Sequence, residues 1–424
     1  MSDSDPQNIV LVTVDSLRED YCGFMGDSRN LTPNMDAAAN DGLLFTNAIS
    51  PGPATLDAMP GIFTGENVPD TEVESDLDWS EQFQHHLRAR GTIAERLSRL
   101  GYETAAFTAN PWTSREFGFD RGFDHFEDFF DETDEEGDDE AAESDDEGDG
   151  PLSTLRYGVQ LARDWRSTSN MFMAWDSFYD DIVAWTEQAS EPYFLWLFLV
   201  DVHMPYLPPS EFRRGTAAST YASNLWLYLQ ATGRDGDIPL ESVFRPPLLR
   251  AYEDTISYTD EYFGRLTTDL DDDDPLFVVH ADHGEGFGER GIYGHGPQLY
   301  RENVHVPLFV ANGPSDRIDE PFSLTRIPDL LETLAADNDP RALTQPIVRT
   351  RNHDPTFAVR GRDWKYIYTP DEEKVFDLTD GEVEVIDDDH RSVGRDVVTL
   401  WRRDERERRD IADAAKTVAI EQDV

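Results

Sequence analysis

The chain contains a single cysteine, Cys22, among its 424 residues. One cysteine excludes an intrachain disulfide and a metal cluster built on several thiolates. Cys22 follows Glu19 and Asp20, and neighbouring carboxylates raise the pKa of a thiol. We therefore expect a structural thiol at this position and not a reactive one.

Long hydrophobic runs are also missing. The longest apolar stretch, from Tyr193 to Val200, is far shorter than the roughly 20 residues that span a bilayer. The first residues, Met1 to Gln7, lack the basic and apolar regions of a secretory signal. From these two absences we expect a cytoplasmic protein that has no membrane partner.

Lysine is scarce, and negative charge dominates. The chain has 87 acidic against 36 basic residues and a formal net charge of −51, with lysine only at 365, 374 and 416. This charge disfavours nucleic acids and anionic membrane surfaces as partners. Because the acidic residues are spread along the whole chain, the composition resembles that of proteins from salt-accumulating halophiles, where salt screens self-repulsion. The alternative is an acidic mesophilic protein with a solvated tail.

Apolar runs alternate with helical patterns along the first three quarters of the chain. Strands separated by helices favour an α/β fold with a doubly wound, largely parallel central sheet flanked by helices. One expected helix begins at Pro33, and another covers Thr92–Leu100 and ends at Gly101. The expected buried strands are Ile9–Val14, Glu103–Ala109, Phe194–Val200, Leu276–His280 and Val306–Ala311.

We expect a catalytic α/β domain over residues 1–345 and a small C-terminal subdomain over 346–424. Residues 127–150 are almost wholly acidic or small, which predicts a disordered loop. A helical cap or insertion is expected over about 152–250, where Tyr221, Trp226, Tyr228 and Phe244 either shape a substrate pocket or are ordinary core. Short strands near 356–361, 365–369 and 374–377 predict an antiparallel sheet, and the arginine-rich tail predicts a solvated helix.

The segment Phe277–Gly288 carries the strongest sign of chemistry. Its apolar run ends in Asp282 and His283, and glycines follow. Open α/β sheets place their ligands at this edge of their strands, and the glycines leave room for a sharp turn. A carboxylate oxygen beside an imidazole nitrogen suits Zn²⁺ or Mn²⁺. A buried, purely structural Asp–His hydrogen bond is the alternative.

A second apolar run ends in a carboxylate at Asp15, and a Pro- and Gly-rich segment follows at Ser50–Gly65. Together these pieces resemble the sulfatase-like branch of the alkaline phosphatase superfamily, which includes sulfatases, phosphonate monoester hydrolases and lipoteichoic-acid-type transferases. Thr55 lies nine residues before the pair Thr64-Gly65, the spacing at which that family carries its nucleophile. The resemblance runs from about residue 7 to 380, through Thr32–Asp36, His203–Tyr206, Tyr293–Gly296, Tyr300–Leu308 and Arg360–Tyr366.

The resemblance implies one divalent metal ion held by Asp15, Asp282, His283 and Thr55, with Thr55 also the nucleophile. A threonine hydroxyl is a weak nucleophile until a metal or base lowers its pKa, which such an ion would do. Mn²⁺ or Zn²⁺ fits these donors best, and Ca²⁺ is a less suitable alternative.

Two further histidines are candidate catalytic residues. His203 and His295 lie in matching motifs, and we expect them to hold the ester oxygens or to protonate the leaving group. His280 lies inside an apolar strand and His305 beside another, so we expect structural roles for both.

Some residues depart from the pattern of the best-known sulfatases. Those enzymes convert a Cys or Ser, followed by Pro and Arg, to formylglycine. Here Thr55 occupies the first position, Met59 stands where the arginine would be, and Ser16 replaces a second metal-binding aspartate. These differences disfavour the formylglycine route and resemble the single-metal members that use a threonine nucleophile.

Three functions therefore remain open. The first is a metal-dependent hydrolase of sulfate or phosphate esters, acting on an anionic small molecule or glycan. The second is a transferase that moves a phospho- or sulfo-substituent onto a glycan or lipid, and the third is a degenerate member that binds an anion without turnover. The sequence leaves open sulfur against phosphorus, mono- against diester, the metal and the oligomeric state.

Overall fold

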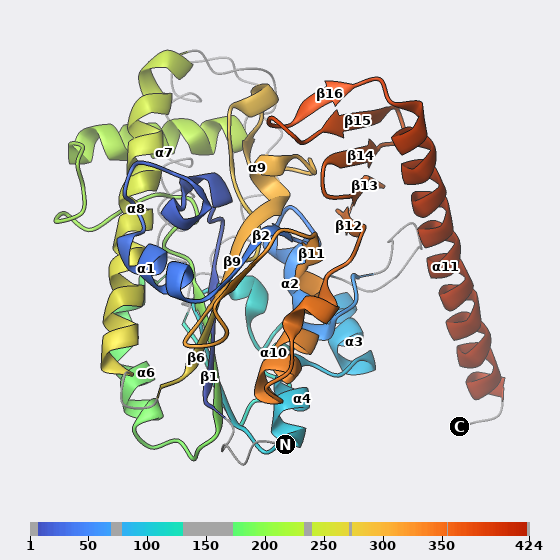
Figure 1. The fold of residues 1–424 in the computed structure, drawn as a ribbon, viewed down its shortest axis with the longest axis horizontal. Coiled ribbons are helices and arrows are strands. Elements are labelled where there is room, and N and C mark those ends of the chain that lie inside the picture. Colours follow the sequence, from blue (N-terminus) through green and yellow to red (C-terminus); the bar gives the residue numbers. More distant parts are fainter. Residues whose placement is uncertain are drawn as a thin grey trace, which may run out of the picture.

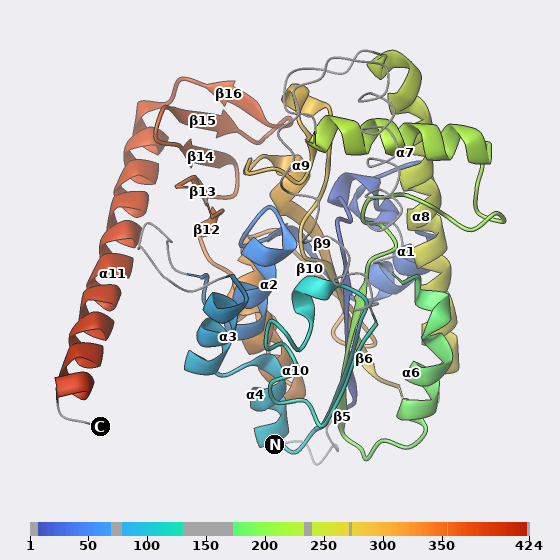
Figure 2. The same cartoon turned by 180° about the vertical axis from the view of Figure 1, so that it is seen from behind.

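The chain forms a large sheet with helices on both faces and a small antiparallel sheet beside it (Figures 1 and 2). The computed structural model describes residues 7–68, 79–129, 173–232, 240–270, 274–353 and 355–421. Most of the acidic segment 127–150 lies outside the described residues. Its first two residues, Glu127 and Asp128, end a strand that pairs with a neighbour, so the expected loop begins too early there.

The large sheet has the strand order β10-β2-β9-β6-β1-β5-β3-β4, and β11 also pairs with β2. Among the described strands of this sheet, β9 is the one that runs antiparallel to its neighbours. The expected α/β class with a largely parallel sheet is confirmed. The strands are β1 (Ile9–Val14), β2 (Leu43–Ile49), β3 (Glu103–Thr108), β4 (His125–Asp128), β5 (Tyr193–Leu199), β6 (Leu276–Ala281), β9 (His305–Ala311), β10 (Asp316–Ile318) and β11 (Phe322–Ser323).

β1 lies in the middle of the sheet because all six of its residues are buried and five of them are aliphatic. It pairs in parallel with β5 and β6, and Val14 lies opposite Leu199 and Ala281. The residues that follow these three strands therefore emerge side by side at one edge of the sheet, where ligands bind in open α/β folds.

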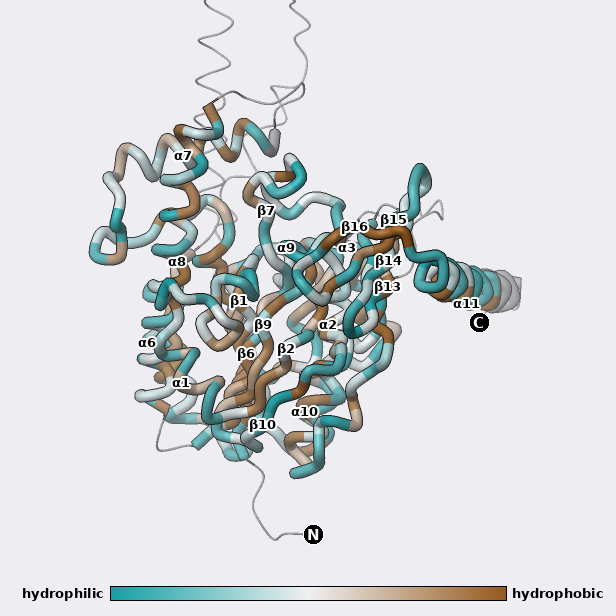
Figure 3. The backbone as a smooth tube through the Cα atoms, turned by 45° about the horizontal axis from the view of Figure 1, so that its top comes forward, coloured by the Kyte–Doolittle hydropathy of each residue, from teal (hydrophilic) through white to brown (hydrophobic). Residues whose placement is uncertain are grey.

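Helices cover both faces of this sheet, while hydrophobic residues concentrate in the central strands (Figure 3). One face carries α1 (Pro33–Asp41), α6 (Tyr179–Thr186) and α8 (Glu241–Asp269). The other carries α2 (Thr55–Thr64), α3 (Trp79–Ala89), α4 (Ile93–Arg99) and α10 (Ile327–Ala335). In the described part of the chain, no helix is both long enough and apolar enough to cross a membrane.

The start of α4 shows how local sequence sets a boundary. The Thr92 hydroxyl accepts from the Glu95 backbone, and the Glu95 side chain accepts from the Thr92 backbone, which forms a capping box. The helix ends before Gly101, which adopts a left-handed φ of 97°. Leu100, the last residue of the expected helix, follows the last helical residue and is 54 % exposed.

The range 152–250 is not a cap of helices alone. Residues up to 172 lie outside the described part, and the remainder includes β5, a central strand. It also includes α7 (Ala217–Thr232), which crosses and packs against α8 (Figure 1). Of the four aromatics considered there, Trp226 is buried and its ring contacts those of Phe244 and Tyr293, as expected for ordinary core.

The C-terminal sheet is an antiparallel meander, as expected. Its strands are β12 (Val348–Arg351), β13 (Phe357–Arg360), β14 (Trp364–Tyr368), β15 (Glu373–Asp377) and β16 (Val383–Val385). The long helix α11 (Asp388–Glu421) lies across this sheet (Figure 1). A fully solvated tail helix was a wrong expectation, because Val398 and Trp401 are buried against the sheet.

Trp401 should anchor α11. Its ring packs against Phe357 at 5.2 Å between centroids, and the residue is 6 % exposed. Trp401→Ala should lower the free energy of unfolding by about 3–5 kcal/mol, as for other buried large-to-small changes. Urea titration in molar KCl measures this, with Leu400→Ala, at a residue that is 52 % exposed on the same helix, as the control. Equal effects of the two substitutions would contradict the packing role.

Glu382 joins the C-terminal sheet to the large one. Its carboxylate accepts from Lys365 Nζ at 2.7 Å, Arg290 Nη2 at 2.8 Å and the Arg301 backbone nitrogen at 3.2 Å. Arg301 begins α9 (Arg301–Val304), just before β9. The two parts of the chain therefore share one buried ionic cluster, although Glu382 lies more than thirty residues beyond the expected boundary near 345.

Candidate active site

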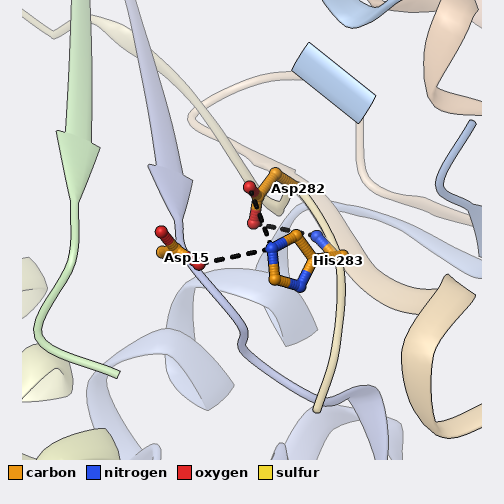
Figure 4. A group of neighbouring side chains, drawn as sticks. All are labelled: Asp15, Asp282 and His283. Atoms are coloured by element: carbon orange, nitrogen blue, oxygen red, sulfur yellow. Dashed lines mark hydrogen bonds and ion pairs between the residues drawn. The ribbon is translucent and has the colours of Figure 1, made fainter. Parts of the chain in front are cut away.

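Three buried side chains meet at the edge of the sheet where β1 and β6 end. Asp15 follows β1, and Asp282 and His283 follow β6 (Figure 4). One ligand atom from each of these residues lies within 4.8 Å of the other two. His283 Nε2 is 3.5 Å from Asp15 Oδ1 and 3.5 Å from Asp282 Oδ2. The strand pairing thus brings together two carboxylates and one imidazole, as the sequence predicts.

The backbone around these residues is held in a specific shape. Ser16 adopts a left-handed φ of 61°, which costs energy for a residue with a side chain. Its nitrogen donates to Asp282 Oδ1 at 3.3 Å, its hydroxyl donates to Asp15 Oδ1 at 2.9 Å, and its carbonyl accepts from the Tyr252 hydroxyl at 2.8 Å. Ser16 therefore orients both carboxylates.

Gly284 allows the chain to turn directly after His283. A Cβ at this position would lie 2.1 Å from the carbonyl oxygen of Glu302, a distance that only glycine avoids. The carbonyl of Gly284 is 2.8 Å from His283 Nδ1, which donates to it. This bond leaves the lone pair of His283 Nε2 directed at the carboxylates.

Thr55 is the first residue of α2 and is 6 % exposed. Its hydroxyl donates to Asp282 Oδ2 at 2.9 Å and lies 3.3 Å from His283 Nε2. A helix N-terminus carries partial positive charge, which favours a bound anion. The structure therefore places this hydroxyl beside the carboxylates and at a position suited to an anionic substrate.

His203 and His295 extend the site on one side. The ring of His295 lies 4.8 Å from that of His283 and 5.0 Å from that of His203, between centroids. Burial, with His295 nearby, lowers the pKa of His203 to about 3. Burial also acts to lower the pKa of His295, but the Glu285 carboxylate outweighs it and raises that pKa to about 9. One imidazole is thus neutral and its neighbour protonated near pH 7.

Sequence reasoning missed two residues that contact this site. Asn110 Nδ2 donates to Asp15 Oδ2 at 2.7 Å. Glu285 lies 3.4 Å from His295 Nδ1 and accepts from the Tyr206 hydroxyl at 2.8 Å. The position of Glu285, two residues after His283, was an available signal, whereas Asn110 depends on the turn that follows β3.

Three residues expected to be structural have that character. His280 Nε2 is 3.0 Å from the Thr13 hydroxyl, and its Nδ1 is 3.0 Å from the Ala281 carbonyl. His305 Nε2 is 3.0 Å from the Thr46 carbonyl oxygen. Cys22 is fully buried, and burial together with nearby acids raises the pKa of its thiol.

The donor set fits a divalent metal ion. Burial and the neighbouring Asp282 carboxylate raise the pKa of Asp15 well above its usual value, so this site lacks positive charge. Two carboxylate oxygens, one imidazole nitrogen and a hydroxyl suit Zn²⁺ or Mn²⁺. Within the described ranges, Asp15, Asp282 and His283 form the one such cluster of metal-binding side chains.

Comparison with known proteins gives consistent results. A family model described as Sulfatase matches residues 7–317. Human iduronate 2-sulfatase is 22% identical over 343 residues, covering 72% of this chain and 60% of the relative. A choline-sulfatase of Rhizobium meliloti (strain 1021) is 29% identical over 170 residues, covering 34% of this chain and 33% of the relative. This chain thus matches less than two thirds of the length of either relative.

Solved structures share the fold. The phosphonate monoester hydrolase of Agrobacterium radiobacter has a TM-score of 0.61 and 17% identity, over 88% of this chain and 89% of that chain. The C-terminal periplasmic domain of EcEptC from Escherichia coli, in complex with Zn, has a TM-score of 0.52 and 15% identity, over 83% and 91%. At these identities the likeness concerns the architecture, an α/β sheet with a C-terminal antiparallel sheet.

Proposed function

The chain belongs to the sulfatase family, and from that premise we propose that it hydrolyses sulfate or phosphate esters with a metal ion and Thr55 as the nucleophile. The observation that carries this proposal is the position of the Thr55 hydroxyl, 2.9 Å from Asp282 Oδ2 and 3.3 Å from His283 Nε2. A hydroxyl among buried metal-binding donors is where a nucleophile can be activated.

Asp15, Asp282 and His283 would hold the ion, with Thr55 as the fourth donor. When bound, a divalent ion lowers the pKa of the hydroxyl and offsets charge on the ester oxygens. The Thr55 proton is held at Asp282 Oδ2, to which the hydroxyl donates. Ser16 and Asn110 keep the Asp15 carboxylate in place through both of its oxygens.

Thr55 Oγ1 attacks the sulfur or phosphorus, and the bond to the alcohol oxygen breaks. His295, whose pKa the Glu285 carboxylate raises, gives a proton to that oxygen, and Glu285 holds the imidazolium in position. Neutral His203 donates or accepts a hydrogen bond beside it. Water then cleaves the Thr55 ester, releases the inorganic acid and restores the hydroxyl.

Transfer is the second candidate function, because it shares with hydrolysis every step up to the Thr55 ester. Thr55 cannot become formylglycine, so the group on its oxygen leaves by attack of an external acceptor, which is water in hydrolysis. A hydroxyl of a glycan or lipid would serve in place of water. The close grouping of Asp15, Asp282 and His283, with the Thr55 hydroxyl beside them, supports a catalytic site over the degenerate anion binder.

Metal removal and a panel of esters test the proposal. The purified protein in molar KCl should contain about one metal ion per chain and should hydrolyse at least one aryl sulfate, aryl phosphate or bis-aryl phosphate ester. Dialysis against a chelator should reduce turnover to background, and Mn²⁺ or Zn²⁺ should restore it. One bound metal without turnover of any ester would favour transfer. Neither metal nor turnover would contradict the proposal.

A further inference from the structure

A cavity adjoins the proposed site. It is a cavity of about 280 Å³ whose wall includes His203, Asp201, Arg213 and Tyr258. His203 is also a neighbour of His295, which lies beside His283. The cavity therefore opens on the side of the site where the leaving alcohol is protonated in the proposed reaction.

Two polar groups on the cavity wall lack the hydrogen bonds that buried atoms normally make. Asp201 Oδ2 and Arg213 Nε are buried and have no partner among the described residues. The other carboxylate oxygen of Asp201 accepts a single long bond, 3.4 Å from the Trp175 nitrogen. Burial raises the pKa of Asp201 to about 7. Leaving such groups unpaired is costly, which points to a ligand that pairs with them.

The charged and apolar residues on the cavity wall indicate which class of ligand the cavity can bind. An organic cation would pair with Asp201 but would be repelled by Arg213, and a second anionic group would be repelled by Asp201 and Asp176. Neutral hydroxyls can donate to the carboxylate and accept from the guanidinium. Pro205, Leu207 and Pro208 supply an apolar surface for ring carbons. The volume lies near the lower end of small-molecule sites, about 300–1,000 Å³, and suits one small ring.

We propose that this cavity binds the alcohol part of the ester and selects a polyhydroxylated ring, such as a sugar or cyclitol, through Asp201 and Arg213. This inference rests on the proposed ester hydrolysis for its role in turnover. The binding of the ring itself depends only on the cavity. Asp201 and Arg213 are thus specificity-determining residues, distinct from the residues that act on the sulfur or phosphorus.

Specificity in turnover is the first test. The kcat/KM of a sulfate or phosphate ester of a pyranose is divided by that of the matching cyclohexyl or aryl ester. At a pH above the raised pKa of Asp201, Asp201→Asn should lower this ratio about tenfold or more, because hydrogen bonds to a charged group contribute at least that factor. Arg213→Gln should lower it in the same direction. Asp180→Asn is the control, since that carboxylate is almost fully exposed on α6 and lies outside the cavity.

Direct binding is the second test and needs no turnover. Calorimetry with methyl pyranosides, myo-inositol and cyclohexanol is run on the wild type and the three variants. At least one polyol should bind the wild type, and bind Asp201→Asn at least tenfold more weakly, while cyclohexanol should not distinguish the two. The thermal midpoint of each variant shows whether it is folded, and Arg213→Gln provides an independent variant if Asp201→Asn is not.

The outcomes separate the two proposals. Polyol binding that depends on Asp201, without hydrolysis of any ester, would keep the subsite and overturn the hydrolase function. Hydrolysis with an unchanged specificity ratio in both cavity variants, and no polyol binding, would overturn the subsite and keep the hydrolase. An equal loss of both ester activities in folded Asp201→Asn also counts against the subsite, because it indicates a general structural role.

Discussion

Replacing Asp282 by alanine should remove metal binding and turnover together. Asp282 Oδ2 accepts from the Thr55 hydroxyl, and Oδ1 accepts from the nitrogens of Ser16 and His283. The substitution therefore removes one proposed metal ligand and also releases the nucleophile and the turn after β1. Turnover should fall by on the order of a thousandfold or more, as when an essential catalytic group is lost. Elemental analysis after desalting should show metal content falling from about one ion per chain to nearly none.

A matched control separates this effect from simple loss of a buried acid. Asp260 is equally buried, and its carboxylate accepts from the nitrogens of Asn34 and Met35 at the start of α1, on another part of the sheet. Asp260→Ala should reduce stability through these lost bonds but keep the bound metal and most of the activity. Full activity in Asp282→Ala would show that the proposed site is wrong.

Thr55→Ala should abolish turnover but leave most of the metal bound. The change removes one hydroxyl, while two carboxylates and the imidazole remain as donors. The loss of a nucleophile should again reduce turnover by on the order of a thousandfold or more. Thr55→Ser is the matched control, because it restores the hydroxyl on the same helix start and should recover much of the activity.

The covalent intermediate on Thr55 allows a second measurement that compares the wild type with Thr55→Ala. Acid quenching during turnover, followed by mass spectrometry, should show one sulfo or phospho group on the peptide that contains Thr55, and this adduct should be absent from the alanine variant. Wild-type turnover in Thr55→Ala would mean that another group attacks the ester. The adduct without release into water, but with release into an alcohol, would favour transfer.

The pattern of buried runs ending in acidic residues pointed to Asp15 and Asp282, and the family resemblance implied that they share the proposed metal site with His283. The direct pairing of β1 with β6 brings these side chains together. Thr55 was found through family spacing, since nothing in a Pro- and Gly-rich loop shows where it will fold. Asn110 could not be found in this way. Its contact with Asp15 depends on β5 separating β1 from β3 by a single strand, a tertiary arrangement that local patterns do not encode.

The α/β fold class could be predicted from the alternation of strand-like and helix-like patterns along the sequence. The direction of each strand could not. After His305, β9 is apolar to its end, so its pattern is indistinguishable from that of a parallel strand, although it pairs antiparallel with β2 and β6. The short edge strand β10 carries Asp316 and Arg317, and such strands have little hydrophobic signal. The burial of Trp401 could not be predicted either, because the arginines and acids around it dominate the composition of α11.

The buried ionic cluster at Glu382 affects how the protein is made. Arg290 lies on the loop between Glu285 and His295, and its guanidinium pairs with a carboxylate encoded near the C-terminus. A ribosome that has translated the whole α/β sheet has not yet supplied this partner. Arg290 on this loop, which carries the proposed general acid, also pairs with Glu302 just before β9. The loop therefore has one carboxylate partner within the large sheet's own part of the chain, and it gains the second only when residue 382 has left the exit tunnel.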